Sequence, residues 1–594
     1  MSAHAQSNLP PVMNWKGESE LLIVRPENLW ITPTEKSGFR TTPGYAETMI
    51  WLKKLCDASQ YLSMISIGKS VEGRDIFMVI ASTEKNITSS SLRRSGKPAF
   101  LAQAGIHSGE IDGKDAGMML LRDIAFGKKR YLIDKVNFLF IPILSVDAHE
   151  RSSPYNRPNQ RGPQSMGWRT NAQNLNPNRD FAKLDTREIR SVIKVINDYD
   201  PLLYMDIHVT DGVDYQYDIT FGGLGLQGNS PDISEWLDNV FKPAADNDLK
   251  SMGHIPGQLL FALNDRDFSQ GNILVAGGPR FSDSYGKLRH MASVLVENHS
   301  LKPFRQRVLG TYILLESTLK LLASQGRSLK DITAKDKAIR SAKVAMDWKV
   351  PQFNSPAIIK AADSIDLLGI ESRIIRSEVT NADHVEWLGK PITMKIINYR
   401  GTEPADFVDR PKGYWIPAAY DEVISRLKMH GIKMNIITQA REVEVEMYRI
   451  ENAKFGSEDQ KGRPFEGRMQ VSGTTRSEVR KQIFPAGSIY ISTDQPLGDL
   501  SMALLEPISK DSFFSWGFFL SIFQRTEYME VYVMEPLAKK MLEESPALQK
   551  EFEEKKAADK NFANDQYAML TWFYSKSKFY DDRYLLYPVG RELK

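Results

Sequence analysis

Runs of apolar residues that alternate with helical segments constrain the fold of the first half of this chain most strongly. Three such runs are Ile76–Ser82 (IFMVIAS), Pro98–Gly105 (PAFLAQAG) and Val136–Leu144 (VNFLFIPIL). Leu202–Ile207 and Ser293–Val296 have the same character. Continuous apolar strands are typical of sheets that are buried on both faces. We therefore expect an α/β fold with a mixed, mostly parallel sheet flanked by helices.

The segments between these strands have helical patterns. The end signals agree with this interpretation, because Pro231 suits the start of a helix and Pro243 is expected to mark the end of that helix. The side chain of Asp112 is expected to cap the helix Gly113–Phe126. The expected helices are Gly113–Phe126, Thr186–Asp198, Pro231–Phe241 and Phe304–Leu322.

The second half of the chain, from about Thr333, has a different pattern. Arg441–Met447 (REVEVEM) alternates strictly, which predicts a half-buried strand. A helix is expected at Ala418–His430, closed by Gly431. Other strands are expected at Ile392–Tyr399, Lys433–Thr438 and Ser488–Ser492, and a charged helical tail at Met534–Asp559. These elements predict a separate α+β domain.

Composition excludes several classes of protein. The net charge of +3 is small for 594 residues, and this argues against nucleic acid or an anionic membrane as a partner. No apolar stretch approaches the roughly 18 residues of a membrane span. The single cysteine, Cys56, cannot form an intrachain disulfide, and its helical-looking surroundings predict a buried small side chain rather than a nucleophile. The aromatic stretch Phe513–Phe523 is expected to pack in the core of the second domain, although a surface patch is the alternative.

Histidine and glutamate residues follow three of the expected strands. His107 and Glu110 lie three positions apart directly after one strand, and His208 ends another. Glu297 ends a third, Val294–Val296. Binding sites in open sheets form at the carboxyl ends of strands, so these side chains are expected to meet. Zinc takes nitrogen and oxygen ligands of this kind and keeps an open position when it is catalytic.

Each of these residues also has an ordinary explanation. Glu110 is a plausible helix cap, His208 a hydrogen-bonded core residue, and Glu297 a surface carboxylate. Four candidates at three strand ends are much harder to attribute to chance. Arg169 and Arg179 lie between them in sequence, and a guanidinium can grip a carboxylate or stabilise an oxyanion. For either arginine alone, a surface position is the ordinary expectation.

The order of these motifs resembles that of the zinc carboxypeptidase family typified by carboxypeptidase A. The resemblance covers roughly residues 42–324, slightly under half the chain, and it is specific only as a set. Its pieces are Ser70-Val71-Glu72-Gly73-Arg74, His107-Ser108-Gly109-Glu110, Asn178-Arg179, Ile207-His208 and Val296-Glu297-Asn298.

The resemblance implies an eight-stranded mixed sheet and one Zn²⁺ ion per chain. By position, His107, Glu110 and His208 match the three zinc ligands. Glu297 matches the glutamate that activates the zinc-bound water and carries its proton to the leaving amine. Arg169 matches the arginine that polarises the scissile carbonyl.

The resemblance also implies residues that bind the substrate. Asn178 and Arg179 match the pair that clasps the terminal carboxylate of a peptide. Tyr285 is a weaker match to a mobile tyrosine that closes over the substrate, because its spacing from Glu297 is shorter than in the pancreatic enzymes.

Three positions depart from the family pattern. Gly109 stands where the pancreatic enzymes have an arginine, which removes one substrate contact. Asn176 stands where an aspartate normally orients the first histidine; an amide oxygen can accept the same hydrogen bond but has no charge. Thr210 replaces a tyrosine just after the third ligand. The specificity surface is therefore not that of a digestive enzyme.

The leading functional hypothesis is a zinc metallocarboxypeptidase that acts on peptides with a free terminal carboxylate. One alternative is a zinc amidase for cell-wall peptides or a deacylase for N-acyl amino acids. Another is a non-catalytic peptide-binding protein with a peptidase fold. The oligomeric state and the preferred terminal side chain do not follow from the residues.

The expected division of the chain is an extension at 1–41, a catalytic domain at 42–332 and an α+β domain of unknown role at 333–594. Ala3-His4-Ala5-Gln6 has the small-x-small pattern of a signal-peptide cleavage region, although the basic and apolar parts that precede such a region are absent. This favours a periplasmic or secreted protein, and a cytoplasmic protein with a disordered tail is the alternative.

Overall fold

The computed structural model describes residues 8–222, 229–350, 363–401, 403–456, 462–525 and 527–593. The segment Ala3–Gln6 lies outside these residues, so export stays a prediction. In the described part of the chain, no helix combines the length and the apolar character that a membrane crossing requires.

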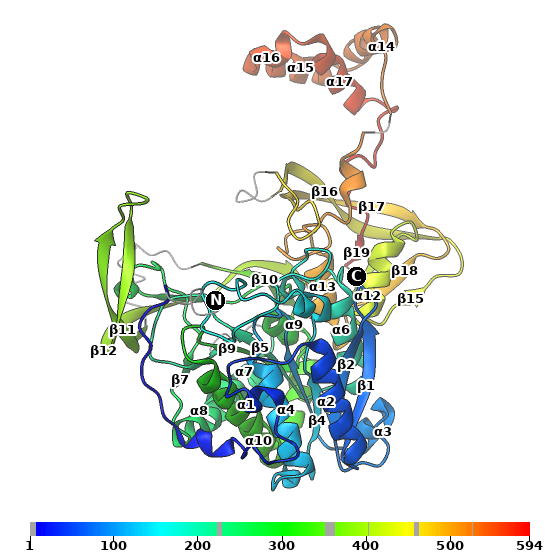
Figure 1. Cartoon of the computed structure of the whole chain (residues 1–594). Coiled ribbons are helices and arrows are strands. Elements are labelled where there is room, and N and C mark those ends of the chain that lie inside the picture. The colour runs from blue at the N-terminus through cyan, green and yellow to red at the C-terminus, as the bar shows by residue number, and fades with distance from the viewer. Residues whose placement is uncertain are drawn as a thin grey trace.

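A mixed eight-stranded sheet forms the centre of the first half of the chain (Figure 1). Its strand order is β1-β2-β4-β3-β5-β9-β6-β7, and β4, β3, β5 and β9 are parallel neighbours. This confirms the predicted fold class. The strands are β1 (Leu62–Lys69), β2 (Asp75–Ala81), β3 (Ala99–Ala104), β4 (Asn137–Ile141), β5 (Leu203–Val209), β6 (Ile219–Gly222), β7 (Pro256–Gln258) and β9 (Ala292–Asn298).

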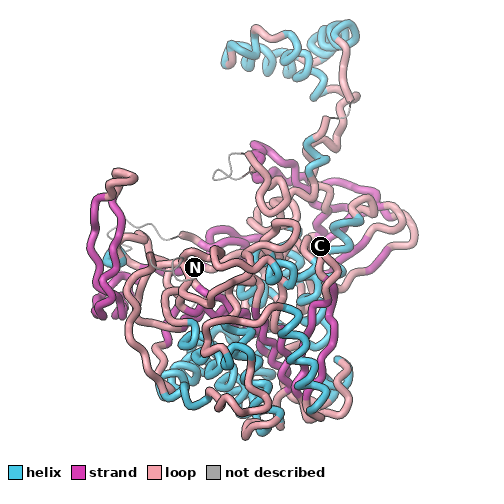
Figure 2. The backbone as a smooth tube through the Cα atoms, in the orientation of Figure 1, coloured by secondary structure: helices cyan, strands magenta, loops and turns pink. Residues whose placement is uncertain are grey.

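Helices cover the faces of this sheet (Figure 2). Strand side chains alternate between the faces, so Phe100 and Ala102 pack in the cluster that contains α4 and α10, whereas Leu101 packs with α6. The helices of this half are α1 (Pro33–Lys36), α2 (Tyr45–Ala58), α3 (Ser89–Arg94), α4 (Asp112–Ala125), α5 (Val146–Glu150), α6 (Arg187–Tyr199), α7 (Pro231–Trp236), α8 (Lys242–Ser251), α9 (Ser282–Leu288) and α10 (Phe304–Ala338).

Two of the predicted helix signals are wrong. Asp112 does not cap α4; its buried carboxylate accepts a hydrogen bond from Arg307 Nε at 2.8 Å, which joins α4 to α10. Pro243 does not end a helix, because a π-helical turn (Leu237–Phe241) links α7 to α8. Pro243 then lies in the first turn of α8, inside the continuous helical run from Pro231 to Ser251.

Helix α10 is longer than expected and runs on to Ala338. Residue 333, the expected start of the second domain, therefore lies inside this helix. The division of the chain at that residue stays a prediction.

The described part of the N-terminal extension packs against the first half of the chain. Ser19 Oγ lies 2.8 Å from His254 Nε2, and both side chains are buried. Glu35 forms a buried ion pair with Arg122 of α4. These contacts attach the N-terminal extension to parts of the first half that are far from it in sequence.

An antiparallel six-stranded sheet forms the centre of the second half, in the order β15-β18-β14-β19-β16-β17. Strand β19 comes from the end of the chain and lies between β14 and β16. The strands are β14 (Gly413–Ile416), β15 (Asn435–Ile436), β16 (Arg441–Phe455), β17 (Val471–Phe484), β18 (Ile489–Ser492) and β19 (Gly590–Glu592); helices α12 (Asp421–Met429) and α13 (Gly498–Leu505) accompany them.

A three-stranded sheet joins the two halves. The long hairpin of β11 (Asp363–Arg376) and β12 (Asp383–Gly401) pairs through β12 with β8 (Asn272–Val275) of the first half. Strands β10 (Lys343–Trp348) and β13 (Pro404–Asp409) form a separate pair.

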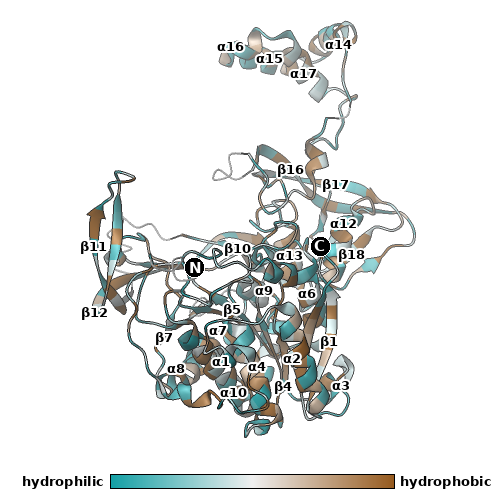
Figure 3. Ribbon diagram, in the orientation of Figure 1, coloured by the Kyte–Doolittle hydropathy of each residue, from teal (hydrophilic) through white to brown (hydrophobic). Residues whose placement is uncertain are grey.

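The predicted helical tail is two helices rather than one. Ser545 separates α14 (Val531–Glu544) from α15 (Pro546–Ala558), because its side chain caps α15 and Pro546 begins that helix. With α16 (Lys560–Ala563) and α17 (Gln566–Lys576) they project from the rest of the chain (Figure 1). These four helices have a small apolar cluster of their own. Both apolar and polar residues are found along them (Figure 3).

Both core predictions are confirmed. Cys56 is buried in α2 with 8% exposure. Phe513, Phe514, Trp516 and Phe519 are each at most 1% exposed. The aromatic stretch is therefore core and not a surface patch.

Candidate metal centre and active site

The turn after β3 and the end of β5 bring three candidate ligands together. His107 and Glu110 follow β3, and His208 lies near the end of β5, the parallel neighbour of β3. One ligand atom from each residue lies within 4.8 Å of the others. His107 Nδ1 is 3.0 Å from Glu110 Oε1, and His208 Nδ1 is 3.0 Å from Glu110 Oε2. All three side chains are at most 2% exposed.

This donor set fits zinc. Two imidazole nitrogens and one carboxylate are ligands that zinc prefers, and three protein ligands leave a position open for chemistry. The second nitrogen of each ring has a polar neighbour: His107 Nε2 forms a 2.9 Å hydrogen bond with Asn176 Oδ1, and His208 Nε2 lies 3.0 Å from Asp206 Oδ2 without hydrogen-bond geometry. Such partners orient imidazole ligands. The Asn176 amide oxygen thus makes the contact expected of it.

Glu297 lies beside this cluster. It pairs with His208 across β5 and β9, so the two side chains share one face of the sheet. Its Oε2 atom is buried and has no hydrogen-bond partner in the described part of the chain. Burial raises the pKa of Glu297 to about 8, and the negative charge of Glu110 adds to this against the opposing effect of His208.

Three groups that are expected to bind substrate lie nearby. Arg169 Nη1 is 3.4 Å from Glu110 Oε1, and the Arg169 side chain is 38% exposed. The Arg179 guanidinium stacks over Phe281 at 4.7 Å and has no ion-pair partner among the described residues. Burial, and then the positive charge of Arg169, lower the pKa of Arg179. Asn178 Oδ1 is buried without a hydrogen-bond partner among the same residues.

Tyr285 is not placed to bind substrate, which corrects the expectation from sequence. Its side chain is fully buried, its hydroxyl lies 2.8 Å from His430 Nδ1, and Arg289 donates a hydrogen bond to it. The ring packs against Phe181. Tyr285 therefore joins the two halves of the chain, and its short spacing from Glu297 reflects a position in helix α9.

Arg157 contacts the cluster although no sequence pattern indicated it. Its Nη1 atom lies 2.8 Å from Glu110 Oε1. A Cβ atom at Gly109 would lie 2.2 Å from Arg157 Cδ, so the glycine leaves the space that this side chain fills. The position that departs from the family pattern thus admits an arginine from another loop.

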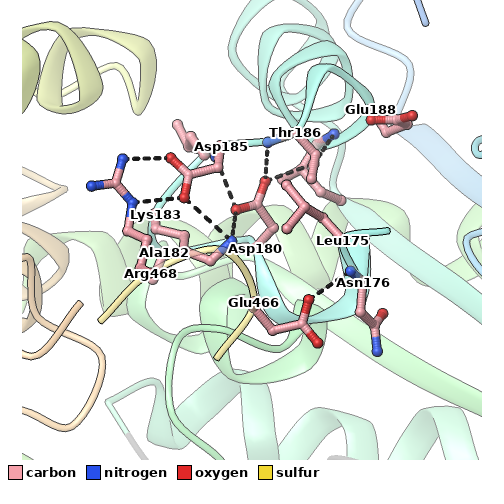
Figure 4. A network of polar contacts seen from close by, with 12 residues as sticks. Leu175, Asn176, Asp180, Ala182, Lys183, Asp185, Thr186, Glu188, Glu466 and Arg468 are labelled. Carbon is pink, nitrogen blue, oxygen red and sulfur yellow. Dashed lines mark hydrogen bonds and ion pairs between the residues drawn. The ribbon is translucent and has the colours of Figure 1, made fainter. Parts of the chain in front are cut away.

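Glu466 reaches the same region from the second half of the chain (Figure 4). Its Oε2 atom accepts a hydrogen bond from the backbone N–H of Asn176 at 2.7 Å. Nothing in the sequence indicated this residue, because 290 positions separate it from Asn176.

Comparisons with known proteins find carboxypeptidases among the proteins that this chain resembles. Residues 48–271 match the profile of the zinc carboxypeptidase family. Carboxypeptidase 2 of Trichophyton rubrum is 22% identical over 497 residues, which cover 80% of this chain and 84% of the relative. Carboxypeptidase Z of Gallus gallus is 29% identical over 157 residues, which cover 25% of this chain and 22% of the relative.

Among solved structures, the chain is similar to a metallo-carboxypeptidase from Burkholderia cenocepacia. The TM-score is 0.35 at 17% identity, and the match covers 47% of this chain and 69% of the other.

Proposed function

We propose that this protein is a metallocarboxypeptidase that hydrolyses the C-terminal bond of peptides, since residues 48–271 match the profile of the zinc carboxypeptidase family. The observation that supports this most directly is the convergence of His107, Glu110 and His208, with Glu297 beside them. These three residues would hold the metal ion. When bound, a zinc ion polarises the scissile carbonyl and makes water a better nucleophile at neutral pH.

Glu297 acts as the general base and then as the general acid. Its free, buried oxygen takes the proton of the attacking water and later gives it to the leaving amine. A pKa raised toward neutrality suits a group that must both accept and release a proton. Arg169, which is partly exposed beside Glu110, donates hydrogen bonds to the oxyanion that develops on the carbonyl.

Arg179 sets the position of cleavage. A guanidinium without an ion-pair partner in the described chain can bind a carboxylate through two parallel hydrogen bonds. The neighbouring positive charges of Arg169 and Arg280 favour an anionic group at the same place, against the opposing negative charges of Glu466 and Asp511. Together with Asn178, Arg179 binds the free carboxylate of the last residue, so that only the terminal peptide bond reaches Glu297.

Glu297→Gln provides the first test. This variant should retain one zinc ion per chain and lose about 10²–10⁴-fold in kcat, because general acid–base catalysis contributes that much. Glu444→Gln, at an exposed carboxylate on β16, is the matched control and should be unaffected. Zinc content by metal analysis and peptide hydrolysis, before and after chelation, give the two readouts. Undiminished turnover in Glu297→Gln would reject the assignment.

Arg179→Met tests the specificity for a free terminus. KM should rise at least tenfold for peptides with a free carboxylate, because a charge-assisted hydrogen bond contributes about 1.5–3 kcal/mol. Peptides with a C-terminal amide should be poor substrates of both proteins. Equal cleavage of free and amidated peptides by the unmodified protein would exclude a carboxypeptidase.

A further inference from the structure

The two imidazoles of the candidate metal centre have unlike partners. His208 has a carboxylate beside its second nitrogen, that of Asp206 at 3.0 Å. His107 has the uncharged amide oxygen of Asn176 at 2.9 Å. Imidazole ligands commonly donate to a carboxylate, which fixes the ring and raises its basicity. His107 therefore has an uncharged partner at its second nitrogen.

The carboxylate of Glu466 contacts Asn176 and not His107 itself. It accepts a hydrogen bond from the backbone N–H of Asn176 at 2.7 Å (Figure 4). The side chain of the same asparagine contacts His107. Asn176 Oδ1 also accepts the N–H of Asn178, which fixes the amide. Glu466 therefore holds the backbone of Asn176, and the side chain of the same residue contacts His107.

The turn that presents Glu466 is held firmly against the loop it contacts. Arg468 forms two hydrogen bonds with Asp185, each 2.8 Å long. Phe465 stacks on the buried Trp516, with ring centroids 6.0 Å apart. Phe465 and Arg468 also exchange backbone hydrogen bonds across the turn.

The backbone at Glu466 adopts a conformation that a glutamate disfavours. Its φ is +47°, in the left-handed region where glycine or asparagine is preferred. The turn alone would be better served by glycine. A glutamate at this position therefore points to a use for the carboxylate, since strained residues gather at functional sites.

We propose that Glu466 is a positioning residue, through which the C-terminal half of the chain completes the metal centre. It acts on His107 by holding the backbone of Asn176, whose side-chain oxygen contacts that imidazole. Direct contact with substrate is disfavoured, because a carboxylate there repels the terminal carboxylate that Arg179 is proposed to bind. This inference rests on the proposed function, and it gives the second half of the chain a role in metal binding.

Glu466→Gly removes the carboxylate and relieves the backbone strain. It therefore separates an effect on zinc affinity from an effect on the stability of the fold. Zinc affinity, measured by competition with a chelator, should fall about tenfold, the lower end of the loss seen when outer partners of metal ligands are removed. The unfolding temperature of the metal-free protein should not fall. Glu466→Gln retains an acceptor for the Asn176 N–H and should lose less affinity than Glu466→Gly.

Asn176→Asp in the Glu466→Gly background is the rescue variant. It places a carboxylate directly beside His107 and should restore zinc affinity. The visible absorption of the cobalt-substituted proteins should change in the variants that lose zinc affinity and return in the rescue variant. Glu444→Gly is the control. Zinc affinity that is unchanged in Glu466→Gly, or is not restored by Asn176→Asp, overturns the inference. Failure of the unmodified protein to bind zinc would instead overturn the proposed function.

Discussion

Replacement of Arg468 by alanine should weaken the attachment of the second half of the chain to the loop that contains Asn176. Arg468 pairs with Asp185 through two hydrogen bonds of 2.8 Å, and the two side chains are only 19% and 14% exposed. The guanidinium also lies 3.6 Å from the ring centroid of Phe518. Arg468→Ala leaves Asp185 with Arg426, 3.2 Å away, and the buried Lys183, 3.6 Å away, as remaining partners.

The expected loss in the free energy of unfolding of Arg468→Ala lies between the values for buried and exposed ion pairs. Removal of one partner from a fully buried ion pair costs about 3–5 kcal/mol, and an exposed pair is worth about 0–1 kcal/mol. Because the Arg468 pair is mostly buried but Asp185 keeps Arg426, we expect a loss of about 2–3 kcal/mol in the free energy of unfolding. Arg476→Ala is the matched control, since Arg476 is 53% exposed and pairs with Glu451 on the surface.

Urea-induced unfolding of the metal-free proteins measures this difference. A double-mutant cycle with Asp185→Asn should give a coupling energy above about 1 kcal/mol, whereas independent sites add within about 0.5 kcal/mol. Hydrogen exchange should quicken at the backbone amides of residues 176–186 in Arg468→Ala alone. A loss no larger than that of Arg476→Ala, with an additive cycle, would refute the role of this ion pair.

Two further predictions concern buried groups outside the metal centre. Burial lowers the pKa of His149 and His299 to about 4 and that of His430 to about 3, from an ordinary 6.5. The unfolded chain therefore binds more protons below pH 6.5, so stability is full above that pH and falls as the pH drops toward 4. In urea titrations, His430→Asn should reduce this slope by about 1.4 kcal/mol per pH unit near pH 5, and an unchanged slope would contradict the assignment. Tyr285→Phe should cost about 1 kcal/mol of stability through the lost hydrogen bond to His430 and leave kcat/KM within about twofold; a large loss of kcat/KM would instead restore a catalytic role for Tyr285.

Local patterns in the sequence were sufficient to predict five strands of the central sheet, but not β1, β6 and β7. The apolar runs at Pro98–Gly105 and Leu202–Ile207 became the parallel neighbours β3 and β5. Parallel strands bring their carboxyl ends to one edge, and this places the residues that follow them together. The meeting of His107, Glu110 and His208 could therefore be expected before any coordinates were known.

Contacts between distant segments could not be predicted in this way. Tyr285 has a suggestive position in the chain, but its burial depends on His430 of the second half. Arg157 lies in a loop without periodicity, and only the fold places it over Gly109.

The sequence by itself determined the apolar strands, the polar residues that follow them and the types of metal ligand that these residues offer. This is because periodicity and strand direction act over short stretches of chain. Only the tertiary structure decided which side chains surround those ligands. Glu466 lies 290 positions from Asn176, and no local pattern encodes a hydrogen bond over that separation. Such a contact forms only when both halves of the chain have folded and packed together.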